Sequence, residues 1–143
     1  MGTGGFMKEF ELLDIATADM AFAAYGKDLN GLFSNAAKAI TSIMFDGKIG
    51  QKIARKMRLE EKEDIVLLQK WLSEIVYLHE SERLLFSRFD VKTDGKKLSA
   101  TVYGEKYDKK KHKFIIDVKA VTYHKMSIEK TKTGYKCTVV VDV

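Results

Sequence analysis

Residues 86–104 read FSRFDVKTDGKKLSATVYG, and this stretch predicts a β-hairpin. Two strand-like arms flank the dipeptide Asp94-Gly95, which tolerates the positive φ angles that a tight hairpin turn requires. A hairpin pairs its strands in antiparallel fashion, so the sheet to which this stretch belongs is expected to be antiparallel.

The chain after the hairpin also reads as β-structure. A basic stretch, KYDKKKHK (106–113), is expected to form a loop, and FIIDVKAVTYHKMSIEK (114–130) one long strand. Thr133-Gly134 then predicts a turn into the last strand, GYKCTVVVDV (134–143). In that strand Cys137 alternates with apolar neighbours, which indicates a small buried hydrophobe rather than a nucleophile.

The chain before the hairpin combines strands with two helices. Helical spacing of apolar residues follows Asp28, a residue typical of an N-cap, and a second amphipathic stretch contains Trp71. The predicted elements are strands over 7–13, 19–25 and 51–59, and helices from Asp28 to Asp46-Gly47 and from Asp64 to His79. The order indicates an α+β fold with a mostly antiparallel sheet and two helices, rather than a doubly wound parallel sheet.

Length and composition predict one domain. The chain has 143 residues, of which 45% are hydrophobic, and it contains no proline. Residues 1–6 are expected to form a flexible leader and residues 7–143 the domain. The sequence contains no apolar run long enough to span a membrane and no secretory signal pattern, so a soluble, cytoplasmic protein is expected.

Net charge indicates the kind of partner, and the absence of known catalytic motifs argues against several classes of enzyme. The net charge of +5 favours nucleic acid or an acidic protein as partner, but acids and bases are mixed along the chain. A solvated loop is preferred over a dedicated RNA patch for residues 106–113. The sequence contains no phosphate-binding glycine loop, no HExxH and no GxSxG, so nothing supports a freestanding enzyme.

The acidic residues offer one candidate site. Asp14 and Asp19 bracket the break between the first two strands, and the last strand ends on Asp142 and the carboxylate of Val143. Acids at a break commonly satisfy backbone N–H groups. Alternatively, Asp19, Asp142 and the Val143 carboxylate would together offer about three oxygen ligands to a hard cation such as calcium.

Several stretches resemble the archease family. Thr17-Ala18-Asp19 matches the family's T-A-D, VKAVTYHKMSIEK (118–130) is close to its most characteristic stretch, and the ending VVVDV matches its terminal Asp plus apolar residue. The family usually has Asp-His directly before T-A-D. This chain instead has Asp14-Ile15-Ala16, without the His and with one residue inserted.

The resemblance implies a non-enzymatic activator of the tRNA-splicing RNA ligase, which promotes guanylylation of the ligase and its multiple turnover. It also implies a pair of strand-helix-strand-strand modules. Carried over by position, Asp19, Asp142 and Val143 would bind a divalent metal ion, calcium first, with magnesium or manganese as alternatives. The implied partner is the RNA-splicing ligase, with no membrane and no DNA involved.

Three residues outside this ligand set are candidates for contact with a partner or nucleotide: Asp14, Lys119 and His124. In a regular strand over 114–130, His124 shares its side with Phe114 and Val118, which favours a core histidine over a functional one. Two other functions stay open. One is a basic RNA-binding or chaperone-like modulator of tRNA-modifying enzymes, with tRNA or such an enzyme as its partner. The other is a small metal-dependent enzyme.

Overall fold

The computed structural model describes residues 8–13 and 19–143, so the predicted leader lies outside the described residues. The elements follow in the order β1 (Phe10–Leu13), β2 (Asp19–Gly26), α1 (Leu29–Met44), β3 (Phe45–Asp46), β4 (Ile53–Glu60), α2 (Asp64–Glu82), β5 (Leu84–Thr93), β6 (Lys97–Lys106), β7 (Lys113–Phe114), β8 (Ala120–Val121), β9 (Ser127–Lys130) and β10 (Tyr135–Asp142). The described helices are not long and apolar enough to cross a membrane.

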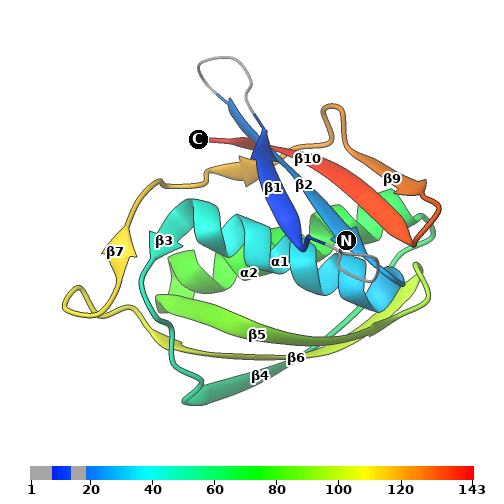
Figure 1. Ribbon diagram of the computed structural model, residues 1–143. Helices are drawn as coiled ribbons and strands as arrows, with labels where there is room; N and C mark the ends of the chain where they lie inside the picture. Colours follow the sequence, from blue (N-terminus) through cyan, green and yellow to red (C-terminus); the bar gives the residue numbers. More distant parts are fainter. Residues whose placement is uncertain (1–7, 14–18) are drawn as a thin grey trace, which may run out of the picture.

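The strands form antiparallel sheets on two sides of the helices (Figure 1). The first sheet has the order β1-β2-β10-β8, with β9 also pairing with β10, and the second has the order β4-β6-β5. A short pair, β3 with β7, lies beside them. The predicted α+β class is confirmed, and both helices lie between the two larger sheets and pack against each of them.

Helix α1 begins as the sequence predicts but ends at Met44, before the predicted Asp46-Gly47, because Phe45 and Asp46 pair with β7 as strand β3. The Asp28 side chain accepts the Gly31 N–H at 2.8 Å, which satisfies one free donor of the first turn. Helix α2 runs three residues beyond the predicted end at His79. It stops where Arg83 takes a left-handed conformation (φ 59°) and donates its N–H to the His79 carbonyl.

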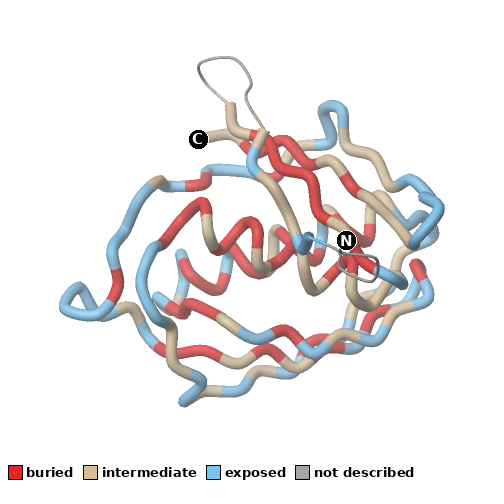
Figure 2. Tube along the Cα trace, viewed as in Figure 1, coloured by how far each residue is buried: buried red, intermediate tan, exposed pale blue. Residues whose placement is uncertain are grey.

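The core lies between the two sheets, around the facing sides of the helices (Figure 2). The Trp71 side chain of α2 is fully buried, and its Nε1–H donates to the Phe33 carbonyl of α1 at 2.9 Å. Phe22 of β2 and Val102 of β6 are fully buried on the inner faces of the two sheets. The helix layer therefore holds the two sheets at a fixed separation.

Both turns predicted from glycine are confirmed. Gly95 has a φ of 95°, and the Asp94 carboxylate accepts the N–H groups of Lys96 and Lys97. At Gly134 the φ is 155°, and an added Cβ would lie 2.1 Å from the Gly26 carbonyl oxygen. A larger residue at position 134 would therefore collide with the backbone at the end of β2.

The predicted long strand over 114–130 is wrong. Only Lys113–Phe114, Ala120–Val121 and Ser127–Lys130 are strands, because the N–H groups between them bond to separate parts of the chain. Ile115 N–H donates to Met44, whereas Lys119 N–H donates to Asp142. A tight turn with Lys125 at a φ of 54° then reverses the chain. Apolar alternation alone does not reveal these changes of partner.

Candidate functional site

The structure places Asp19 and Asp142 opposite each other. Asp19 is the first residue of β2, Asp142 is the last residue of β10, and the two are partners in the antiparallel register. Partners in a register project to the same face of the sheet, with their Cβ atoms about 5 Å apart. Two carboxylates separated by 123 positions in the chain therefore meet at one end of the sheet.

Two further residues adjoin this pair. The Val143 side chain packs against the core, which holds the terminal carboxylate next to Asp142. On the other edge of β10, the Lys119 N–H donates to the Asp142 carbonyl at 2.8 Å, while the Lys119 residue is exposed. We call Asp19, Asp142 and the Val143 carboxylate the acidic tip. Lys119 lies directly beside it.

The acidic tip suits a hard cation. None of the ion pairs among the described residues involves Asp19 or Asp142. Like charges directly opposite each other destabilise a sheet unless a cation neutralises them. Within the described residues no three His, Cys, Asp or Glu side chains gather for a metal ion. The Val143 carboxylate, backbone carbonyls and water would therefore have to complete six or more oxygen ligands.

The other predicted contact residues do not all join the tip. Asp14 lies outside the described residues. His124 is exposed, so the interpretation as a core histidine is wrong, because the chain turns at 123–126 instead of continuing as a strand. Cys137 is fully buried as predicted, and burial raises the pKa of its thiol to about 12.

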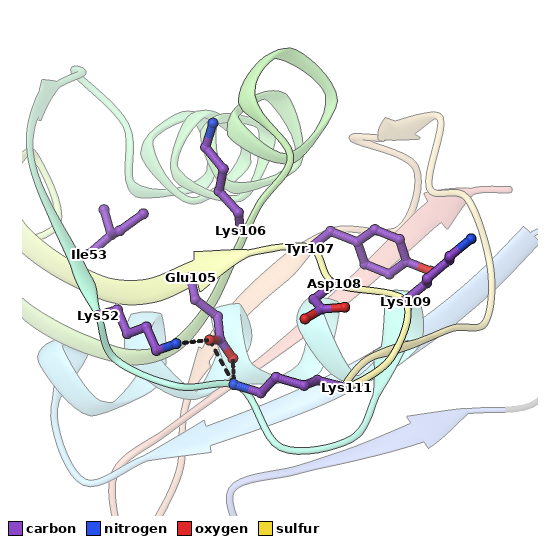
Figure 3. Close-up of a pocket in the computed structure, with 8 residues that line it drawn as sticks. All are labelled: Lys52, Ile53, Glu105, Lys106, Tyr107, Asp108, Lys109 and Lys111. Atoms are coloured by element: carbon purple, nitrogen blue, oxygen red, sulfur yellow. Dashed lines mark hydrogen bonds and ion pairs between the residues drawn. The ribbon is translucent and has the colours of Figure 1, made fainter.

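A second polar site, around Glu105, was missed from the sequence. Glu105 ends the buried part of β6 and is only 5% exposed, yet it carries a carboxylate. The Gly50 N–H donates to it at 2.6 Å, and Lys111 Nζ approaches both oxygens at 2.9 and 3.0 Å. Figure 3 shows Lys52 and Lys111 pointing toward this carboxylate from two segments. These donors lower the pKa of Glu105 to about 2.

His112 completes the Glu105 site. Its Nδ1 accepts the Asp108 N–H at 2.9 Å, so the proton resides on Nε2, which lies 2.9 Å from the Glu105 carboxylate. The imidazole is 2% exposed. The basic loop 106–113, which we expected to be solvated, is therefore only partly so. Its lysines lie at the surface, whereas His112 is buried and holds the loop against β6. These bonds fix the loop to the end of β6, and we call the Glu105–His112 pair with its donors the staple.

The two residues of this staple are visible in the sequence, but nothing in the sequence shows that they are in contact. A single Glu in VYGEK and a single His in KKKHK are seven residues apart, on what reads as a strand and a loop. Only the fold brings them together, because the chain reverses after Tyr107.

Comparison with known proteins gives matches that cover nearly the whole chain. The profile of the Archease protein family matches residues 10–143. An archease protein of Methanosarcina acetivorans is 39% identical over 142 residues, which cover 95% of this chain and 97% of that protein. An archease protein of Sulfurisphaera tokodaii is 39% identical over 140 residues and is covered completely.

Two solved structures are similar in fold. The solution structure of protein 1598 of Methanobacterium thermoautotrophicum superposes with a TM-score of 0.82 at 37% identity, covering 96% of this chain and all of that chain. The crystal structure of a Thermotoga maritima protein, described as an archease and possible chaperone, gives a TM-score of 0.63 at 22% identity over 90% of this chain. The second match supports the fold alone.

Proposed function

Because this chain belongs to the archease family, we propose that it is an accessory protein that activates the tRNA-splicing RNA ligase. In this role it promotes transfer of GMP to the ligase and repeated turnover, without being the catalyst. The ligase works on tRNA, so the cytoplasm is the proposed location. The observation that carries the proposal is the pairing of Asp19 with Asp142 at one end of the β2–β10 ladder.

The acidic tip would hold a divalent ion, with calcium as the first candidate and magnesium or manganese as alternatives. Asp19, Asp142 and the Val143 carboxylate supply the charged oxygen ligands. Bound there, the ion supplies positive charge that offsets the negative charge of phosphate groups.

The chain itself contributes a rigid platform for these ligands. Asp19 and Asp142 are fixed by consecutive register pairs that continue as far as Tyr135 and Gly26. Val143 is anchored by its apolar side chain, so its carboxylate cannot swing away from β10 without exposing that side chain. Lys119 lies next to the tip, where an exposed ammonium group would contact an acidic group or a phosphate of the partner.

The test is transfer of labelled GMP to the cognate RNA ligase, with substoichiometric amounts of this protein. We expect stimulation by the native chain and loss of stimulation by Asp19→Asn and Asp142→Asn. The matched control is Glu129→Gln, which removes one exposed acid from β9 in the same sheet but away from the tip. Equal stimulation by native protein and tip variants would contradict the metal role, and absence of stimulation by native protein would contradict the ligase role.

A further inference from the structure

The sheet β4-β6-β5 has one buried and one open face. Met57, Phe89 and Val102 point into the core, and their neighbours along each strand therefore point to the opposite side. Figure 1 shows the helices on only one side of these three strands, and Figure 2 shows exposed positions alternating along them. The outer face is thus an open surface three strands wide.

The register arranges the outward residues in rows across the three strands. Each row has one residue from β4, one from β6 and one from β5, and every row has at least one basic side chain on an edge strand. The rows are Arg58–Ser99–Lys92, Lys56–Thr101–Asp90 and Ala54–Tyr103–Arg88. We call Lys56, Arg58, Arg88, Lys92 and Tyr103 the basic sheet face.

Three cations of this face have no acidic partner within the described part of the chain. Lys56, Arg58 and Lys92 are exposed, and none forms an ion pair with a described residue. Asp90 does not neutralise them, because Arg88 Nε and Nη2 already hold its carboxylate at 3.1 and 3.0 Å. Strands lie about 4.8 Å apart, so Arg58 and Lys92 flank Ser99 about 10 Å from each other. Among the described residues, Lys56, Arg58 and Lys92 therefore carry unpaired positive charge on this face, with the exposed Glu60 beside Arg58 at the end of β4.

Tyr103 adds a ring to this surface. The Arg88 guanidinium lies 4.8 Å from the ring centroid, a cation–π contact that fixes the ring on the sheet. The neighbour on the other side is Ala54, whose methyl group is too small to cover the ring. Aromatic rings on an open sheet stack nucleic acid bases, and hydroxyls such as those of Ser99 and Thr101 bind phosphate or sugar oxygens.

We propose that the basic sheet face binds single-stranded RNA, with Lys56, Arg58 and Lys92 on its phosphates and Tyr103 under a base. A membrane surface fits less well, because the exposed large apolar side chains of the described residues, such as Phe114 and Ile115, lie elsewhere. An acidic peptide would use the cations but not the half-buried ring of Tyr103.

The lysine-rich loop 106–113 is a weaker candidate for the same ligand. Lys111 is held by Glu105, and Lys52, the other lysine beside that carboxylate, lies 3.9 Å from it. The ring of Tyr107 packs against Phe45 and His112, at centroid distances of 5.8 and 6.0 Å, so it is not free to stack a base.

RNA binding of this kind is independent of the acidic tip. The tip belongs to β2 and β10, and the helix layer separates that sheet from β4, β5 and β6 (Figure 1). RNA on the basic sheet face would therefore leave the tip accessible to a ligase. Binding to RNA is measured without the ligase, so its outcome is separate from that of the GMP-transfer test.

The experiment is fluorescence anisotropy of a labelled, unstructured RNA of about 15 nucleotides. Its length exceeds several times the distance of about 10 Å between Arg58 on β4 and Lys92 on β5. The test variant is Arg58→Gln with Lys92→Gln. Its matched control is Lys109→Gln with Lys110→Gln, which removes the same charge from the loop. We expect the sheet variant to weaken binding about tenfold and to reduce the salt slope by about 1.4, because two phosphate contacts are lost. The loop variant is expected to bind within about twofold of the native chain.

Tyr103 provides an independent arm of the test. Tyr103→Leu is expected to weaken binding about fivefold or more, and Tyr103→Phe to retain it, because stacking needs the ring and not the hydroxyl. An equal loss of RNA affinity in the sheet variant and the loop variant would show that only the net charge of the protein matters, and it would overturn the proposal. Absence of binding by the native chain, or competition by polyglutamate as effective as that by unlabelled RNA, would also overturn it.

Discussion

Asp142→Asn should have opposite effects on stability with and without a divalent ion. In the native chain the Asp142 carboxylate faces that of Asp19 across the β2–β10 ladder, and described residues provide no ion pair to either. Without a metal ion, the substitution removes a like-charge repulsion. With a metal ion bound, it removes a charged ligand.

The magnitudes follow from the cross-strand geometry. Like charges at the Cβ separation of register partners, about 5 Å, cost about 0.5 kcal/mol. In chelator the variant should therefore melt about 2 °C higher, taking about 4 °C per kcal/mol for a domain of this size. Calcium at about 100 times its Kd stabilises the native chain by about 2.7 kcal/mol, or about 11 °C, whereas a variant with about 100-fold weaker binding gains only about 0.4 kcal/mol.

The assay is thermal unfolding of the native chain, Asp142→Asn and Glu129→Gln, each in chelator and in calcium. The order of stability of the first two should reverse between the conditions, while Glu129→Gln should follow the native chain. A variant less stable than the native chain in chelator would show that Asp142 has a structural partner. A native chain that gains nothing from calcium, magnesium or manganese would refute the metal site.

Three further outcomes test the staple and the core. The folded pKa of Glu105 is about 2, below its ordinary value of 4.5, so its contribution to stability is present above pH 4.5 and is lost as the pH falls toward 2. In Glu105→Gln the free energy of unfolding should therefore fall less steeply than in the native chain as the pH is lowered from 4.5 toward 2. An equally steep fall in both proteins would show that other groups cause the loss of stability in acid. Trp71→Phe should cost about 2–4 kcal/mol in urea unfolding, because it leaves a cavity and removes the indole hydrogen bond to the Phe33 carbonyl. A cost below about 1 kcal/mol would show that the neighbouring side chains relax into the cavity. Gly104→Ala should destabilise by about 3 kcal/mol or prevent folding, since its Cβ would lie 1.8 Å from the Leu85 carbonyl oxygen, and a native melting temperature would contradict that packing.

The structure also relates the two surfaces to each other. The acidic tip lies at the end of one sheet and the basic sheet face covers the outside of the other, with the helix layer between them. A chain with a modest net charge of +5 can in this way present separate regions of opposite sign. The two proposals are testable separately because no residue belongs to both surfaces.

Local patterns in the sequence determined most of the elements. The N-cap at Asp28, the turns at Gly95 and Gly134 and the apolar stripes of both helices depend on residues close together in the chain, so their spacing identifies them. The same locality explains the burial of Cys137, whose neighbours two positions away share its face. Fold class follows from these elements and their order.

The tertiary structure alone decided which distant residues meet. The register that pairs Asp19 with Asp142, the docking of His112 on Glu105 and the breaks between 114 and 130 all depend on hydrogen bonds between segments far apart in sequence. A strand pattern states which side chains share a face but not which strand lies beside it, and a slip of one residue would move every side chain to the other face. That choice is made by the packing of the whole core, and both the acidic tip and the basic sheet face result from it.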